Sequence, residues 1–234
     1  MNSWSVFVKT FVDPVKAFAS IKDKPVIALA FIVSLVMGMA TAFVVTRHMD
    51  EAGIRAAIRE TVEKRGGNMS DAQIEENAAL QVKISRIAGP IAGLVMPAII
   101  YLLVALVFFL LFKLADADLS YKQSLSVTVH GFLPGLISSI LTIGLILKAG
   151  TVDPQHAEGI LKSNLGFLAD PETQKALYSI LSSVDLFSLW CLGLLTLGFG
   201  LATGRGFQKT LPFTVGLWVL YIAGKVGLGM VFGR

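Results

Sequence analysis

The polar residues that could do chemistry in this chain are few and far apart. His130 and Lys225 each lie inside a long apolar run, and Asp185 stands at the start of another. A histidine titrates near neutral pH and could relay protons, and a lysine inside a membrane often marks a solute path. Each also has a structural interpretation. His130 can form a hydrogen bond across a helix interface, and Lys225 can extend its stem to the membrane surface or pair with Asp185.

Sequence signatures of common enzymes are missing. The chain has no HExxH, GxSxG or GxxxxGK[ST] motif, and its histidines, His48, His130 and His156, are dispersed. The pair Asp116-Ala-Asp118 resembles a metal-binding DxD, although acidic residues before a helix also interact favourably with its N-terminal dipole. The only cysteine, Cys191, excludes an intrachain disulfide and a cysteine-based zinc site. We therefore expect a protein that is not an enzyme and that binds no cofactor or metal.

The elements that must position these residues are membrane-spanning helices. Residues 87–112 carry no charge in 26 positions, and as a helix they would extend about 39 Å, against a hydrocarbon core of roughly 30 Å. The composition agrees, with 54% hydrophobic and 15% charged residues and a mean hydropathy of +0.71. The sequence predicts an all-α, polytopic membrane protein that forms a single domain over residues 1–234. Its five transmembrane helices are expected at about 25–46, 87–112, 125–147, 186–203 and 211–232.

Residues 1–24 form an amphipathic segment before the first span. Asp13 suits the N-cap, and Pro14 the first position, of a second short helix that carries Phe18, Ile21 and three lysines. Such a segment can lie at the membrane interface against anionic headgroups, or it can pack on the end of the bundle. In the first short helix the apolar residues Trp4, Phe7, Val8, Phe11 and Val12 recur at helical spacing, and Ser5, Lys9 and Thr10 occupy the other side.

Two long polar loops separate the spans on the opposite side, and each is predicted to be a helical hairpin. In residues 47–86, a helix over 50–65 is broken at Gly66. Ser70 with Gln73 then forms a capping box for a helix that continues into the second span. Residues 148–185 have a similar layout. Pro154 can open a helix that residues 164–166 break, and the Asp170-Pro171-Glu172 stretch caps another that leads to the fourth span.

The distribution of basic residues indicates the orientation. Segments 1–24, 113–124 and 204–210 share one side and carry eight basic residues in about 43 positions, whereas the other side carries eleven in about 80. The higher density close to the spans predicts a cytoplasmic N-terminus and a C-terminus outside. His130 and Lys225 then fall in different halves of the bilayer and do not form one site. With so little polar surface, the net charge of +4 indicates membrane orientation and not nucleic-acid binding.

Glycine spacing indicates where helices can approach closely. Such spacing permits packing inside the molecule or self-association. Four Gly-x-x-x-Gly pairs occur, beginning at Gly89, Gly131, Gly200 and Gly229.

Three stretches of the chain resemble one family. The fourth span begins with DLFSLW, from Asp185 to Trp190, and continues to LLTLG, which ends at Gly198. A glycine- and lysine-containing turn and Leu217-Trp218 follow. Before the first span stands Asp13-Pro14-Val-Lys-Ala-Phe18. The helix entry SYKQSL, residues 120–125, precedes Gly131 and Pro134 in the third span. Together these stretches resemble the bacterial branch of the Yip1-domain family.

The resemblance implies a five-span protein of the bacterial inner membrane without known chemistry. Its expected role is to organise the bilayer or to bind other membrane proteins. The expected partners are lipid, other membrane proteins or a second copy, and no nucleic acid. His130 and the long outer loops depart from the family pattern. The acidic cytoplasmic region of the eukaryotic trafficking members is absent, so binding to Rab-type GTPases is not expected. The alternative function is a small-solute or ion transporter or channel that uses Lys225 and His130.

Overall fold

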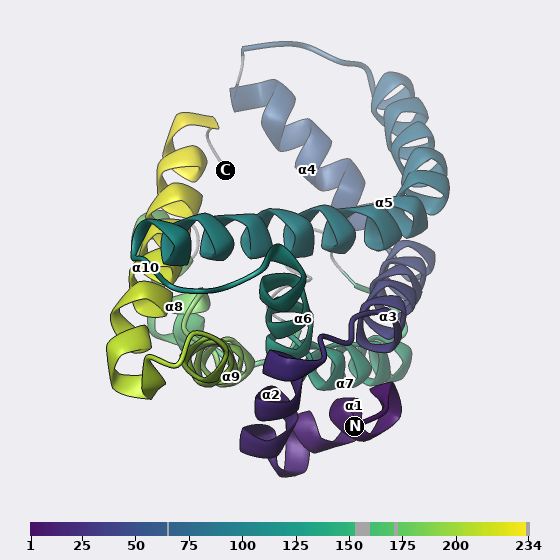
Figure 1. The fold of residues 1–234 in the computed structure, drawn as a ribbon. Helices are drawn as coiled ribbons and strands as arrows, with labels where there is room; N and C mark the ends of the chain where they lie inside the picture. Colours follow the sequence, from purple (N-terminus) through teal and green to yellow (C-terminus); the bar gives the residue numbers. More distant parts are fainter. Residues whose placement is uncertain (65, 153–159, 171–172, 233–234) are drawn as a thin grey trace. The chain divides into compact units, whose positions relative to one another are not determined.

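The structure, a computed structural model, describes residues 1–64, 66–152, 160–170 and 173–232. These residues form mainly helices (Figure 1). Two isolated β-bridges join Met49 to Val152 and Asn164 to Asp185. The chain divides into two compact units. The first unit holds residues 1–34, 98–138 and 162–234, and the second holds residues 35–97 and 139–161. The helices are α1 (Ser3–Val12), α2 (Pro14–Asp23), α3 (Ala28–Arg47), α4 (Glu51–Lys64), α5 (Asp71–Leu114), α6 (Tyr121–Gly131), α7 (Pro134–Ala149), the 3-10 helix η2 (Leu165–Leu168), α8 (Lys175–Ser182), α9 (Leu186–Ala202) and α10 (Gly206–Phe232).

The predicted spans correspond to long apolar helices. Within the described ranges, four helices are long and apolar enough to cross a membrane: α3, α5, the pair α6–α7 taken together, and α10. The predicted fourth span is α9, an apolar helix of 17 residues. At 1.5 Å per residue α9 extends about 26 Å, slightly less than the hydrocarbon core. The chain is therefore an all-helical, multi-pass membrane protein.

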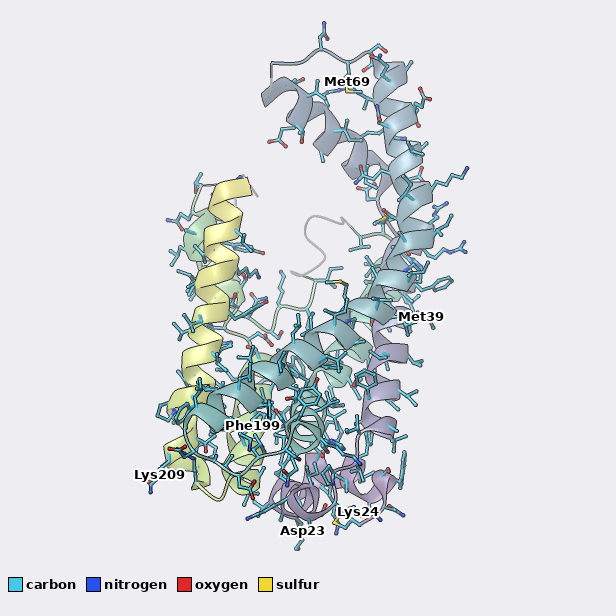
Figure 2. All side chains as sticks on the ribbon, turned by 45° about the horizontal axis from the view of Figure 1, so that its top comes forward. Asp23, Lys24, Met39, Met69, Phe199 and Lys209 are labelled. Atoms are coloured by element: carbon cyan, nitrogen blue, oxygen red, sulfur yellow. The ribbon has the colours of Figure 1, made fainter. Side chains whose placement is uncertain are left out.

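Helix α9 is the centre of the first unit. It packs against α2, α6 and α10, and most of its side chains from Cys191 to Ala202 are buried. Phe199, labelled in Figure 2, lies on this helix. Its ring stacks on Phe108 and Phe112 of α5, with ring centroids 4.3 and 5.4 Å away. Large apolar side chains from helices distant in the sequence thus meet around α9 and form the core.

The N-terminal segment forms two short helices joined at Asp13. The Asp13 carboxylate accepts a hydrogen bond from the Lys16 N–H, and Pro14 occupies the start of α2, as the sequence predicts. The expectation for the faces of α1 is wrong in part. Thr10 is fully buried and donates its hydroxyl to the Val6 carbonyl, whereas Val12 is 74% exposed. A threonine can line the bundle because its own helix satisfies its hydroxyl.

In the second unit, α3 and α5 cross at glycines. A Cβ on Gly38 would lie 2.4 Å from the Gly93 carbonyl oxygen, and one on Gly93 would lie 2.6 Å from the Ala42 Cβ. A Cβ on Gly89 would lie 2.5 Å from Thr46 Cγ2. The predicted pair Gly89 and Gly93 therefore serves packing inside the molecule, because only hydrogen atoms at these positions let the backbones approach.

The other predicted glycine pairs have different surroundings. Gly131 faces Leu195, Gly200 faces the backbone of Gly206, and Gly135 faces open space. Gly204 adopts a positive φ in the turn between α9 and α10. In the last pair, Gly233 lies outside the described residues.

The loop between α3 and α5 holds the helix α4, which packs on the first turns of α5. Ile54, Ala78 and Val82 are buried between the two helices. Arg55 pairs with Glu75 at 2.9 Å, and Arg59 pairs with Asp71 at 2.6 Å. The capping box of Ser70 and Gln73 begins α5, and this helix continues without a break to Leu114.

The second loop differs from the predicted hairpin where it is described. The helix expected to open at Pro154 lies mostly outside the described residues, and residues 160–164 are not helical. The 3-10 helix η2 begins at Leu165, where a break was expected. Helix α8 ends at Ser182 and does not continue into α9, because Asp185 adopts extended backbone and caps α9 separately. A short bridge between Asn164 and Asp185 holds this end of the loop to α9.

Candidate functional site: a polar helix inside an apolar bundle

Helix α6 is the most polar segment of the buried bundle. All of its residues from Ser124 to Gly131 are buried except Leu125, which is partly buried. Four of the buried residues carry a polar side chain: Ser124, Ser126, Thr128 and His130. In a membrane protein such groups require partners inside the protein, since lipid offers none. Each of these side chains therefore has to be accounted for individually.

Hydroxyl groups of α6 bind the backbone of other segments. Ser124 Oγ donates to the Ala105 carbonyl of α5 at 2.6 Å, and Ser126 Oγ donates to the Val26 carbonyl ahead of α3, also at 2.6 Å. At the start of α6, Ser120 and Gln123 form the predicted capping box. The Gln123 side chain also donates to the Lys22 carbonyl at the end of α2, at 2.6 Å. The polar side chains of α6 thus connect it to three other parts of the first unit.

His130 is enclosed and bonded within its own helix. Its side chain is 1% exposed, and Nδ1 lies 2.8 Å from the Ser126 carbonyl oxygen. A carbonyl only accepts, so Nδ1 carries the proton and Nε2 is left as an acceptor in the neutral ring. The structural interpretation from the sequence was a hydrogen bond across a helix interface. The hydrogen bond from Nδ1 runs along α6 instead. Whether His130 has a further function stays a prediction.

The polar helix ends at a break inside the apolar bundle. Gly131 is the last residue of α6, and Pro134 begins α7 after two residues of turn. A Cβ on Gly131 would lie 2.5 Å from Leu195 Cδ2, so the glycine lets α9 approach. Proline suits the first position of α7 because it has no N–H to satisfy there. These two family-like positions therefore have local, structural explanations.

The family-like positions at the two ends of the chain meet in space. Phe11, two residues before Asp13, contacts the Trp190 ring at a centroid distance of 6.2 Å. Farther along α9, a Cβ on Gly198 would lie 2.8 Å from two atoms of the Phe18 ring and 2.6 Å from Val127 Cγ1. The two N-terminal helices thus lie along the side of α9, from Trp190 to Gly198.

Asp185 has a clear local role at the start of α9. The Asp185 carboxylate accepts hydrogen bonds from the N–H groups of Phe187 and Ser188, at 2.8 and 3.3 Å, and so caps α9. Lys225 lies in α10 and is partly exposed. Asp185 therefore has a reason to be acidic that does not depend on Lys225, and the predicted pairing of the two stays a prediction.

Basic residues gather at one end of the first unit. Figure 2 shows Lys24 and Lys209 at this end, together with Asp23. The Arg205 guanidinium donates to the Ala115 carbonyl, where α5 has ended, and Asp116 next to it adopts a positive φ of 55°.

Across the described part of the chain, no group of three or more His, Cys, Asp or Glu side chains could hold a metal ion.

Sequence reasoning missed the enclosure of α6. The signal was present, because serine or threonine occupies positions 120 and 124 just before the predicted span of residues 125–147, and positions 126 and 128 at its start. Hydroxyls at that density are typical of a helix that faces other helices on several sides, not lipid.

The fold and this site define an integral membrane protein whose interior polar groups hold its own helices together. The family model of the Yip1 domain matches residues 8–228, which is nearly the whole chain. The chain belongs to the Yip1 domain family, as the resemblance of the short stretches indicated. No curated protein and no solved structure matches it.

Proposed function

We propose that this protein is a non-enzymatic membrane protein that organises the bilayer or binds other membrane proteins. The observation that carries the proposal is how the buried polar groups are used. Ser124, Ser126 and the Thr196–Thr214 pair, whose hydroxyl oxygens are 2.6 Å apart, bind parts of the same bundle. These hydrogen bonds hold helices of the bundle together. Family membership supports a membrane role of this kind.

The proposed arrangement has five spans, with α9 as the fourth. A helix about 26 Å long can cross a bilayer that is slightly thinned around it. It can also cross a bilayer of ordinary thickness if its capped ends lie in the interface. The N-terminus would then be cytoplasmic, in a bacterial inner membrane, and the C-terminus outside. The basic end of the first unit agrees with this orientation, since cytoplasmic segments near spans are enriched in lysine and arginine.

Among the residues that the structure describes, no contact supports the transporter alternative. His130 is enclosed and bonded to its own helix, and Asp185 is engaged at the start of α9. A solute path through this bundle would require polar side chains that converge on water, and the Ser124 and Ser126 hydroxyls of α6 are directed at backbone carbonyls instead.

Reconstitution into vesicles tests the proposed function. Increasing amounts of the purified chain should change vesicle diameter or produce tubules, while trapped ions and small solutes are retained. Vesicles that keep their size but leak a particular solute would contradict the proposal and restore the transporter alternative.

Affinity purification after crosslinking in the source membrane tests the second half of the proposal. A recurrent membrane-protein partner or a crosslinked dimer should be recovered. The matched control is an unrelated multi-pass protein with the same tag, expressed at the same level. Recovery of the same proteins with both baits would contradict specific binding.

A further inference from the structure

Helix α1 has one face buried in the protein and the other uncovered. Val6 and Thr10 are at most 1% exposed, whereas Trp4 is 65% and Val12 74% exposed. Val8, on the same side, is also exposed. A tryptophan and two valines on an outward face cost free energy in water, so this face requires an apolar neighbour.

The position of the hairpin α1–α2 identifies that neighbour as the membrane. Helix α2 ends at Asp23 and α3, the first span, begins at Ala28. The four residues between them reach at most about 14 Å. The Gln123 side chain also binds the carbonyl of Lys22 and fixes this end to α6. The hairpin therefore stays beside the point where the chain enters the bilayer.

An aromatic row joins the uncovered face to the bundle. Trp4, Phe7 and Phe11 follow one another along α1, with ring centroids 6.0 Å apart at each step, and Phe11 contacts Trp190 at 6.2 Å. Tryptophan rings favour the boundary between headgroups and acyl chains. Phe11 at the end of the row thus joins α1 to α9, and α1 cannot move away from α9 without breaking this ring contact.

The charge of the hairpin indicates which headgroups it meets. Residues 1–24 contain four lysines and two aspartates. Asp13 is paired with Lys16 at 2.8 Å, and Lys22 and Lys24 are exposed at the end of α2. A basic polar side next to an apolar face is typical of helices that lie in the interface of an anionic membrane.

We propose that the outward face of α1 inserts into one leaflet of the bilayer, among anionic phospholipids, as a wedge fixed to α9. The inference rests on the proposed role in organising the bilayer and names its surface and its partner. A helix inserted in one leaflet adds area there and not in the other, and this difference bends a membrane.

Depth-dependent fluorescence quenching of the full-length chain tests the insertion. In the variant with Trp190→Phe and Trp218→Phe, Trp4 is the only tryptophan. In vesicles of phosphatidylcholine and phosphatidylglycerol, lipids brominated near the glycerol end of the acyl chain should quench Trp4 strongly, and iodide in the buffer should quench it weakly. The matched control keeps Trp218 of α10 alone, through Trp4→Phe and Trp190→Phe, and reports a residue within a span.

A second comparison tests the role of charge. Phosphatidylcholine alone, or the substitutions Lys22→Gln and Lys24→Gln with both lipids, should lower the quenching of Trp4 by brominated lipid and raise its quenching by iodide. Both changes leave the Trp218 control unaltered. Equal insertion in neutral and anionic vesicles would overturn the anionic preference.

Two other results would overturn the insertion itself. Strong quenching of Trp4 by iodide would place α1 in water. Protection from both quenchers would place a protein, or a second copy of the chain, on this face.

These measurements distinguish a failure of the wedge from a failure of the proposed function. If Trp4 inserts and vesicle diameter is unchanged, the shaping role fails. If diameter changes while Trp4 stays in water, the wedge fails.

Discussion

Gly198 on α9 lies directly against the ring of Phe18 on α2. A Cβ at position 198 would be 2.8 Å from both Phe18 Cδ1 and Cε1, which is closer than real Cβ atoms approach other heavy atoms. Both residues belong to stretches that resemble the Yip1 family, and 179 positions of sequence separate them. The contact explains why a fully buried phenylalanine and a glycine occur at these two positions: the ring occupies the space that the missing side chain leaves.

Gly198→Ala should therefore destabilise the protein, by about 1–3 kcal/mol, because the added methyl group forces the Phe18 ring and α2 away from α9. The measurement is thermal unfolding in detergent. Gly193→Ala is the matched control, since it lies on the same helix and faces open space. Alanine is the better helix former at both positions. An equal effect of the two substitutions would contradict the role of Gly198 in packing.

Two buried threonines should respond differently to the same change. Thr196 shares a hydrogen bond with Thr214, whereas the Thr128 hydroxyl has no partner among the described residues. Thr196→Val should cost about 1 kcal/mol in the free energy of unfolding, because it breaks a buried hydrogen bond. Thr128→Val should be neutral or stabilising. Unfolding in detergent measures both. A large loss for Thr128→Val would show that its hydroxyl has a partner.

Lys225→Met should leave folding unharmed or improve it, because it keeps the stem and removes a charge that is costly in a membrane. Asp185→Asn should be mild as well, since asparagine caps a helix about as well as aspartate. If Asp185 were the buried partner of Lys225, Asp185→Asn would be harmful and Lys225→Met would restore stability in the double variant. A stable Lys225→Met chain that has lost its activity in the source cells would instead favour a solute path.

The orientation predicts which cysteines a membrane-impermeant reagent labels. In a Cys191→Ala background, a cysteine at Asn68 should be labelled in intact cells, and one at Lys209 only after lysis. Both positions are exposed and lie beyond the predicted spans. The two variants act as controls for each other, because only the cysteine at position 68 is accessible in intact cells and both are accessible after lysis. The reverse pattern would place the N-terminus outside.

The turn between α1 and α2 should tolerate acid. A hydrogen bond from the Lys16 side chain lowers the pKa of Asp13 below its ordinary 3.8. A carboxylate with a lowered pKa adds stability above its unfolded pKa, and this stability is lost as the pH falls through the folded value. The turn should thus loosen only below pH 3.8. Lys16→Gln should move that transition to higher pH, as Trp4 fluorescence in the single-tryptophan variant would report. An unchanged transition would contradict the pairing.

The sequence by itself determined the elements that depend on neighbouring residues or on the solvent. Long apolar runs such as residues 87–112 must be helical in lipid, because only a helix satisfies its own backbone there. The caps at Asp13, Ser70, Ser120 and Asp185 depend on an N–H group two or three residues away, so local patterns are enough to place them.

Only the tertiary structure decided which faces are covered. Thr10 is buried and Val12 exposed because of what packs on α1, and a helical pattern cannot name that neighbour. The seryl side chains of α6 find carbonyls at Ala105 and Val26, which are 19 and 100 positions away. Contacts between segments so distant in the sequence are set by how the helices pack, and the polarity of a single stretch does not specify its partners.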